Sequence, residues 1–340
     1  MTARVKLCAI AKNEGPYLAD WVFHHLHFGF DAIEVWVNGT EDASMRILRR
    51  IAAQHPQVRA RNADALLEEC LTQRRHFQQR AYNRLAKRAE AEGFTHVAFL
   101  DLDEFWTPRD FRSSIKAFLP ADPEVKVVSF PWALDVPDRG REPFPTPFTG
   151  PVDVQLQENV KSVGRFDNSI ATAMTHTFAI DEGRRLLVRD PFPLVDPVAQ
   201  VDGSRLLRQQ LATWWDRLPE AFVYHAINRS EREYLATIIK GYRQSGHDYE
   251  FKTNRKGYLP AAGPVVTFRP PRARLLHYRW RRRAFHRSLD VERMVRRSRR
   301  LVLRRAEALV QRVETDPEAR AFLAPVLEGT GLAQGAEPRP

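Results

Sequence analysis

The sequence predicts an α/β protein, with an open, mostly parallel twisted sheet that carries helices on both of its faces. Short apolar runs typical of buried strands alternate four times with helical patterns over the first hundred residues. This alternation favours a parallel, doubly wound sheet. The chain has 340 residues, 43% of them hydrophobic and 28% charged. Such a composition is typical of a globular protein that can bury a large core.

The first half of the chain supplies the repeating units of strand and helix. Buried strands are predicted at residues 5–11, 32–37, 58–63 and 96–100. The helices between them are predicted to begin at Gly15-Pro16, to follow the polar turn at 38–42, and to occupy residues 73–92. Proline suits the first turn of a helix, and polar side chains can cap its first amide groups.

The second half is predicted to extend the sheet with strands at residues 125–130 and 160–166. Between them, residues 136–151 are rich in Pro, Gly and Phe, which predicts an ordered surface loop of the kind that frames an active site. A helix is expected over residues 230–244, because Ser230 and Glu233 have the spacing of a capping box.

The C-terminal region is expected to form a basic helical extension. Arginines gather beyond Arg272, and apolar residues recur at helical spacing over 289–313. We therefore divide the chain into three parts. The first domain covers residues 1–250 and has two halves, 1–106 and 107–250. A helical extension follows at residues 251–328, and a disordered tail is expected at residues 329–340.

The net charge is +11 and the isoelectric point is near 9.9, which indicates anionic partners such as nucleotides, acidic glycans or a membrane surface. Two cysteines cannot build a disulfide framework, and no segment has the roughly 20 apolar residues of a membrane span. The N-terminal residues also lack the apolar segment of a signal peptide. We expect a cytoplasmic protein, with peripheral association at the inner face of the membrane as an option.

Two aspartates, Asp101 and Asp103, stand at the end of the predicted strand 96–100. In an extended chain they point to the same side, at the edge where open α/β sheets bind ligands. Two carboxylates so placed suit Mn²⁺ or Mg²⁺, which then meets substrate phosphates. The alternative is an acidic helix start, since Pro108 and Asp110 can open a helix. Neither a Gly-x-Gly-x-x-Gly fingerprint nor a Walker loop follows the first strand, so dinucleotide and P-loop chemistry are disfavoured.

Further motifs accompany these aspartates in a fixed order along residues 4–245. They are Lys12-Asn13-Glu14, Asn38-Gly39-Thr40-Glu41-Asp42, Gln79 with Asn83, Asp101-Leu102-Asp103, Trp132, Lys161-Ser162 with Arg165, His176, and His225-x-x-x-Arg229-Ser230-x-x-Glu233-Tyr234. Together they resemble the GT-A-fold glycosyltransferases, in particular the branch around families 2 and 92. The sequence departs from the family after the tryptophan, where Ala133-Leu134-Asp135 replaces Phe-Gly-Ser, and in the late motif, at Ala226 and Arg229.

The resemblance implies a GT-A-like fold and a metal-dependent enzyme. Such an enzyme moves a sugar from a nucleotide-sugar donor to a hydroxyl of a glycan, lipid-linked or other acceptor, here with inversion. The resemblance implies that the metal, Mn²⁺ or Mg²⁺, is bound by Asp101, Asp103 and His225. It implies donor contacts from Glu14, Asn38, Gln79, Asp101 and Lys161. Structural roles compete with three of these: a helix-capping acid for Glu14, a turn asparagine for Asn38 and a core histidine for His225.

An inverting transfer needs a general base to take the proton of the acceptor hydroxyl. Asp135 is the leading candidate, because by analogy it lies on the acceptor side, and the next candidates are Glu158, Asp167 and Asp196. A second cluster of titratable groups, His24, His25 and His27, cannot share one helix face. Packing and solvent exposure are therefore expected for these histidines instead of metal binding.

Two other functional classes account for part of the sequence. Haloacid-dehalogenase-type phosphatases also place Asp-x-Asp at a strand end, but usually on the first strand and with Thr or Val where Phe105 stands. A nonenzymatic polyanion-binding protein explains the arginines beyond Arg272 but not the clustered acids. The same arginines can face an anionic membrane surface. Nucleic acid is not expected as a partner, since no module that binds it is recognised.

Overall fold

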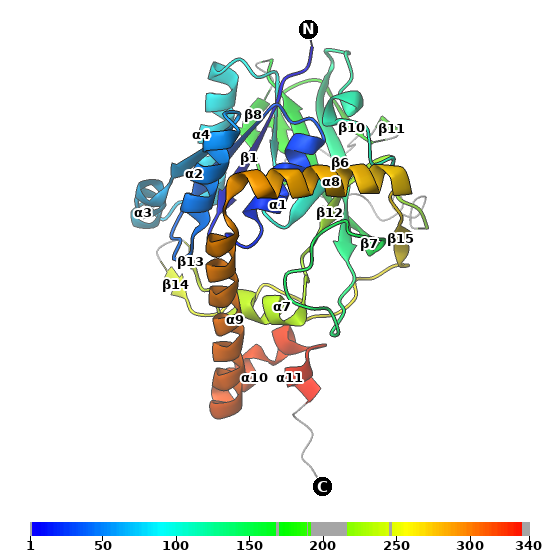
Figure 1. Ribbon diagram of the computed structural model, residues 1–340. Helices are drawn as coiled ribbons and strands as arrows, with labels where there is room; N and C mark the ends of the chain where they lie inside the picture. Colours follow the sequence, from blue (N-terminus) through cyan, green and yellow to red (C-terminus); the bar gives the residue numbers. More distant parts are fainter. Residues whose placement is uncertain (1, 168–169, 189, 192–215, 245–246, 335–340) are drawn as a thin grey trace.

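The computed structural model describes residues 2–334, except 168–169, 189, 192–215 and 245–246. Within these residues, a sheet of eleven strands runs through the molecule in the order β11-β10-β6-β7-β4-β1-β2-β3. Three further strands join this path, since β12 pairs with β5 and β6, and β15 pairs with β7. Figure 1 shows helices α2, α3 and α4 on one side of the sheet, α8 across its front, and the C-terminal helices extending below it.

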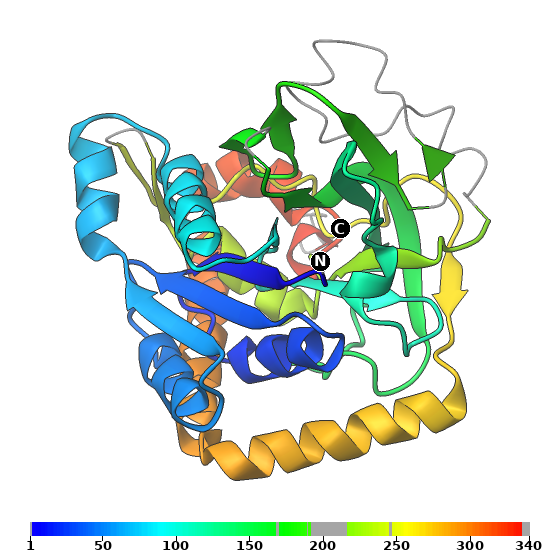
Figure 2. The ribbon, with the colours of Figure 1, turned by 90° about the horizontal axis from the view of Figure 1, so that it is seen from above.

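One half of the sheet is parallel and contains the strands β1 (Val5–Ala11), β2 (Ala32–Val37), β3 (Val58–Asn62) and β4 (His96–Phe99). Helices α1 (Leu18–His27) and α2 (Ser44–Gln54) cover one face, and α3 (Asp64–Thr72) and α4 (Phe77–Ala91) cover the other (Figure 2). The alternation of side chains along the strands explains the two layers. Leu7 and Ala9 belong to the core under α1 and α2, whereas Cys8 belongs to the core under α4.

The other half is mixed, and the long strands β6 (Val125–Asp135) and β7 (Val152–Arg165) form its centre as an antiparallel pair. The strands beside them are β5 (Glu104–Pro108), β10 (Arg184–Leu187), β11 (Asp190–Pro191), β12 (Ala221–His225) and β15 (Val266–Phe268). Two small hairpins, β8 (Ile170–Ala173) with β9 (Phe178–Ile180) and β13 (Tyr242–Gln244) with β14 (His247–Tyr249), and a short 3-10 helix, η1 (Ile115–Phe118), complete this half.

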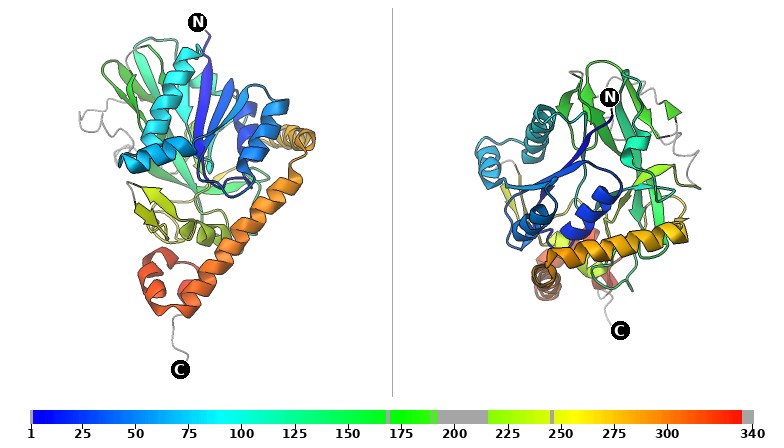
Figure 3. Two further views of the ribbon diagram at one scale, coloured as in Figure 1. Left: turned by 90° about the vertical axis from the view of Figure 1, so that its left-hand side faces the viewer. Right: turned by 45° about the horizontal axis from the view of Figure 1, so that its top comes forward.

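The remaining helices are α7 (Glu231–Ile238), α8 (Arg272–Leu289), α9 (Glu292–Thr315), α10 (Pro317–Leu327) and α11 (Gly331–Gln334). Figure 3 shows α9 running from α8 down to α10 along one side of the molecule. Tyr278 and Phe285 of α8 are buried in the same core as α1, and α9 shares a third core with α7 and α10. The expected basic extension is thus helical, and it packs into the body of the protein.

The predicted fold class, an α/β protein with an open sheet and helices on both faces, is confirmed. Ser230 and Glu233 form the predicted capping box at the start of α7. Four details differ from the predictions. The helix expected over residues 230–244 ends at Ile238, and Tyr242–Gln244 form strand β13. The helix expected at 73–92 is shorter and follows the unpredicted α3, Pro108 ends strand β5 instead of opening a helix, and α11 lies in the tail expected to be disordered from Gly329. Residues 335–340 of that tail lie outside the described residues.

Helices in the described part of the chain are all too short or too polar to cross a bilayer.

Candidate active site

A cleft of about 620 Å³ opens at the carboxyl ends of β1, β2, β4 and β12. This is the edge where open α/β sheets bind ligands, and the volume lies within the usual range for small-molecule sites. The cleft brings together five of the predicted site residues, Glu14, Asn38, Asp101, Asp103 and His225. Side chains from distant parts of the chain complete it, among them Lys12, Arg75, Gln78, Trp132, His176, Lys240, Lys252 and Arg255.

The two aspartates reach the cleft from a tight turn between β4 and β5. The amide of Glu104 donates to the carbonyl oxygen of Asp101 at 3.0 Å, which closes the turn. Strand β5 then leaves to pair with β12 instead of returning along β4. The expected extended chain is therefore a turn, but Asp101 and Asp103 both line the cleft, as predicted.

Asp103 and His225 face each other across the junction of this turn with β12. The amide of Ala226 donates to the carbonyl oxygen of Asp103 at 2.8 Å, and Nε2 of His225 lies 3.5 Å from Oδ2 of Asp103. Burial lowers the pKa of His225, but the Asp103 carboxylate outweighs burial and raises it above its usual value. Burial likewise raises the pKa of Asp103, and His225 with two arginines, Arg229 and Arg255, brings it well below the usual range.

The pair fits a divalent metal ion. Metal–ligand distances near 2.1 Å allow two donor atoms 3.5 Å apart to share one coordination sphere. Carboxylate oxygen and imidazole nitrogen both suit Mn²⁺. No group of three or more His, Cys, Asp or Glu side chains with metal-binding geometry occurs among the described residues. Asp103 and His225 would therefore hold the ion, and water or substrate oxygens would fill the other positions.

The Asp101 carboxylate is fixed by buried partners. Its Oδ2 lies 3.3 Å from the Lys161 ammonium, and its Oδ1 accepts from the Tyr82 hydroxyl at 3.3 Å. Lys161 also meets Oε2 of Glu104 at 3.1 Å and the carbonyl oxygen of Thr175 at 3.1 Å. Burial raises the pKa of Glu104 to about 7 against the pull of Lys161. Burial lowers the pKa of Lys161, but the two carboxylates reverse this and keep it charged.

The loops after β1 and β2 form the other wall of the cleft. Asn13 has a left-handed backbone with φ 57°, and its Oδ1 accepts the amides of Glu41 at 2.7 Å and Asp42 at 3.3 Å. Asparagine tolerates this conformation better than most residues. These bonds join the two loops and present Glu14 and Asn38 to the cleft. The predicted turn at 38–42 therefore has a structural function in addition to lining the site.

Cations outnumber acids along the cleft. The cationic side chains that line it are Lys12, Arg75, Lys240, Lys252 and Arg255, whereas the acidic ones are Glu14, Asp101 and Asp103. Lys240 pairs with Glu14 at 2.6 Å. The sequence did not single out Arg75, Lys252 or Arg255, because isolated basic residues in loops carry no motif in an arginine-rich chain. Such a mixture of acids and cations suits a diphosphate bound together with a metal ion.

The structure places two predicted donor contacts differently. The Gln79 side chain is exposed on α4 and does not line the cleft, whereas its neighbour Gln78 does and donates to the Tyr82 hydroxyl at 3.1 Å. One position along a helix turns the side chain by roughly 100°, so the motif identified the helix but not the residue. Lys161 is buried behind Asp101, where it supports the carboxylates instead of lining the cleft.

Asp135, the predicted general base, is a structural residue. Its buried carboxylate accepts the amides of Asn228 at 2.9 Å and Arg229 at 2.8 Å and pairs with Arg141 at 3.0 Å. It lines neither the cleft nor the cavity described next. Of the alternatives, Glu158 and Asp167 do not line the cleft, and Asp196 lies outside the described residues.

The adjacent histidines of α1 are packing residues, as expected for them. His24 bonds to the Tyr278 hydroxyl at 3.0 Å and to the carbonyl oxygen of Trp106 at 2.8 Å. His25 bonds to the carbonyl oxygen of Trp21 at 2.9 Å and to the amide of Trp106 at 3.2 Å. Burial lowers the pKa of His25 to about 3, so the ring stays neutral in the core.

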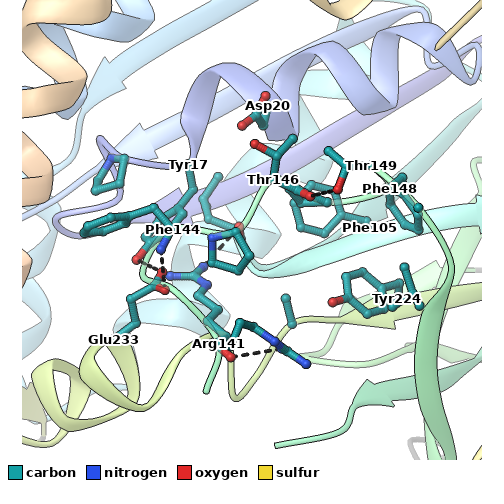
Figure 4. Close-up of a pocket in the computed structure, with 18 of the residues that line it drawn as sticks. Tyr17, Asp20, Phe105, Arg141, Phe144, Thr146, Phe148, Thr149, Tyr224 and Glu233 are labelled. Carbon is teal, nitrogen blue, oxygen red and sulfur yellow. Dashed lines mark hydrogen bonds between the residues drawn. The ribbon is translucent and has the colours of Figure 1, made fainter. Parts of the chain in front are cut away.

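A second cavity of about 300 Å³ lies behind the turn between β4 and β5, where Leu102 is part of the wall of both the cavity and the cleft. Figure 4 shows Phe105, Phe148 and Tyr224 on one side of it and Tyr17 with Glu233 on the other. Arg229 also lines this cavity. Its guanidinium stacks on the Tyr17 ring at 3.4 Å and lies 3.7 Å from Glu14 of the cleft. Arg229 therefore positions Glu14 from behind.

Comparisons with known proteins give remote likenesses. No family model and no curated protein matches the chain. The mannosyltransferase PcManGT from Pyrobaculum calidifontis, solved with GDP-Man and Mn²⁺, is 13% identical over 95% of this chain and 79% of its own, with a TM-score of 0.36. The bifunctional glycosyltransferase WbbM, solved without ligand, is 16% identical over 41% of this chain and 24% of its own, with a TM-score of 0.24. Likenesses this remote carry no argument, so function is argued from the site.

Proposed function

We propose that the protein is a metal-dependent glycosyltransferase that moves a sugar from a nucleoside-diphosphate sugar to a hydroxyl group. The observation that carries the proposal is the pairing of Asp103 with His225, 3.5 Å apart, in a cleft lined by five cationic side chains. Carboxylate and imidazole suit a divalent ion. The surrounding cations suit a diphosphate, because its negative charge is larger than one metal ion neutralises. The cleft lies at the carboxyl edge of the parallel strands, where nucleotides commonly bind in open α/β sheets, and this supports a nucleotide as the ligand.

The roles of the side chains follow from their positions. Asp103 and His225 would bind Mn²⁺ or Mg²⁺, which neutralises the diphosphate as it departs. Asp101, held by Lys161 and Tyr82, presents a fixed carboxylate to the metal-bound water or the ribose. Lys240 and Arg255 lie in the cleft as donors to phosphate oxygens. Glu14 and Asn38 present oxygen and amide groups to the nucleoside.

The acceptor is proposed to be a hydroxyl of a glycan or of a lipid-linked or other substrate. It would meet the donor beside Trp132 and His176, since these rings lie 5.0 Å apart and Trp132 packs on His225 at 4.4 Å. Inversion at the anomeric carbon is part of the proposal and rests on the family resemblance. The anomeric configuration of the product, measured by NMR, tests that part directly.

Metal dependence tests the proposal as a whole. A panel of nucleoside diphosphates and their sugars should include at least one ligand that binds with Mn²⁺ and raises the melting temperature of the protein. EDTA should abolish this binding, and the Asp103→Asn variant should weaken it by about 100-fold or more, because the amide no longer neutralises the ion. Calorimetry measures the affinity, and release of free sugar or transfer product measures turnover.

The matched control is Asp181→Asn, which removes an exposed carboxylate that does not line the cleft. It should leave donor affinity unchanged. Equal affinity in EDTA and in Mn²⁺ would contradict the metal assignment. Hydrolysis of simple phosphate esters without any turnover of nucleotide sugars would favour the phosphatase alternative instead.

A further inference from the structure

Helix α8 presents an unusual outward face. The helix has seven arginines and no acidic residue among its 18 residues. Its inner face is buried at Tyr278, Phe285 and Leu289, and opposite to it Leu276 and Trp280 are 54% and 63% exposed. Figure 2 shows α8 lying along the outer side of α1 and α2, with no described element beyond it.

The exposed apolar and basic side chains form one stripe. Leu276, Trp280, Arg283 and Arg287 follow one another at spacings of four, three and four residues, which places them on the same face of a helix. All four are exposed. We call these four residues the α8 stripe. A helix face that exposes a tryptophan and a leucine together with arginines is typical of helices that lie in a membrane interface.

An apolar cleft of about 520 Å³ adjoins the stripe. It lies between α8 and the ends of α1 and α2, and Phe23, Leu26, Trp280, Ala284 and Phe285 form much of its wall. The exposed side chain of Arg281 also lines this cleft. A cleft that is mainly apolar and carries a cation at its wall can receive the glycerol and upper acyl region of a phospholipid while the phosphate meets the arginine.

The helix is held rigidly, so the stripe keeps its orientation. Asp20 of α1 accepts from Nε of Arg282 and from Nε2 of His286, both at 2.6 Å. The Tyr278 hydroxyl bonds to His24 in the core. These contacts occupy the inner face, which leaves the stripe as the part of α8 available to a partner. A surface fixed before binding avoids the entropy of ordering a free helix.

We propose that the α8 stripe docks the protein onto a bilayer surface that contains anionic phospholipid. Charge complementarity between the arginines and the phosphate groups attracts the protein, and insertion of Trp280 and Leu276 adds apolar burial that a soluble polyanion cannot provide. This inference concerns a surface apart from the donor cleft and does not depend on the proposed transferase activity.

Vesicle binding by the whole protein tests the proposal. Co-sedimentation should be measured with vesicles of phosphatidylcholine alone and of phosphatidylcholine with an equal amount of phosphatidylglycerol, and glycerol phosphate should be added as a free headgroup. Two variants change the stripe, Leu276→Ser with Trp280→Ser, and Arg283→Gln with Arg287→Gln. Their controls are Phe322→Ser, which removes a side chain that is 63% exposed on α10, and Arg297→Gln with Arg300→Gln on α9, where both are exposed.

The protein is expected to bind the anionic vesicles and not the neutral ones, with little competition from glycerol phosphate. Loss of the two stripe arginines should weaken binding roughly 30-fold, at about 1 kcal/mol for each charge near the surface. The serine variant should weaken it by a similar factor, and both controls should bind as the unchanged protein does. Absent vesicle binding, or an equal loss in the α9 control, would overturn the proposal. Full binding by the serine variant would overturn the insertion of Trp280 and Leu276, and strong competition by glycerol phosphate would assign the surface to a soluble anion instead.

Discussion

At the scale of single residues, the turn that carries Asp101 and Asp103 is supported by a buried lysine. Lys161 contacts Asp101 and Glu104, and its side chain is 1% exposed. A lysine at this depth contributes by compensating the buried carboxylate of Glu104 and the half-buried one of Asp101, because an unpaired charge in the interior is strongly unfavourable. The side chain therefore supports the site without lining the cleft. Lys240, at 2.6 Å from Glu14, differs because it lines the cleft itself.

The contrast between these lysines gives a paired prediction. Lys161→Gln should lower the free energy of unfolding by about 3 kcal/mol, since it removes the partner of a buried acid. Lys240→Gln should change the free energy of unfolding by less than about 1 kcal/mol, as its ion pair is partly exposed. It should weaken binding of a nucleoside diphosphate roughly tenfold through loss of one charged hydrogen bond. Urea unfolding and calorimetry measure the two effects, and the reverse outcome would assign Lys161 to the ligand.

Sequence reasoning found the central residues of the site but not their supports. Asp101 and Asp103 were predictable because an apolar strand ends abruptly in acids. The role of Asp135 as general base stays a prediction, and its position after Trp132 could not reveal that the turn at Asn228 and Arg229 encloses its carboxylate. Contacts between residues more than ninety positions apart leave no local pattern. The cleft residues Arg75 and Arg255 were missed for the same reason.

At the scale of elements, the attachment of α8 to α1 depends on one carboxylate. Asp20 is paired with Arg282 and His286, and its side chain is 14% exposed. Burial raises the pKa of Asp20, but His286 and Arg282 outweigh burial and bring the pKa well below its usual value. The lowered pKa means that ionised Asp20 stabilises the folded protein at every pH above the pKa of an unfolded aspartate, about 3.9.

The pH dependence of stability follows from this sign. The contribution of Asp20 is fully present near pH 7 and is lost as the pH falls below about 4 toward its folded pKa. Asp20→Asn should therefore lower the free energy of unfolding by about 2 kcal/mol at pH 7, and the difference from the unchanged protein should shrink below pH 4. Urea unfolding at several pH values measures it, with the exposed Asp181→Asn as control. A difference that grows toward low pH would contradict the assignment.

The first two strands were easier to predict than the C-terminal helices. The ranges predicted for β1 and β2 agree with the structure, because their continuous apolar runs are buried on both faces. The helix predicted over 289–313 corresponds to α9, but the separate helix α8 was not delimited in advance. Asp290 between them has φ 50°, a left-handed conformation that ends α8. An aspartate in that conformation gives a weaker sequence signal than glycine would.

At the scale of the whole molecule, the C-terminal helices close the core. Tyr278 and Phe285 pack on Phe23 of α1 at ring distances of 5.0 and 5.5 Å. Ser298 of α9 is buried beside Gly15 and accepts the amide of Ala43, next to the loops that form the cleft wall. The sequence predicts a separate extension from residue 251, because arginines dominate the composition of that region. The inner face of this region is apolar and belongs to the core under α1 and to the core that α9 shares with α7 and α10.

A chain that ends at Pro271 should therefore fail to fold cooperatively. Loss of the C-terminal helices would uncover Phe23 on α1 and Tyr234 on α7, both of which are buried. Exposing large apolar side chains lowers the free energy of unfolding by about 25 cal/mol for each Å² of apolar area that is no longer buried. The truncated chain should bind a hydrophobic dye, lose its sharp melting transition and lose donor binding along with it. The matched control is Arg297→Gln with Arg300→Gln, which lowers the charge of α9 without shortening it and should melt as the unchanged protein does. If the truncated chain melts cooperatively and still binds a nucleoside diphosphate with Mn²⁺, then residues 1–271 contain the complete donor site and the C-terminal helices serve only the surface they present.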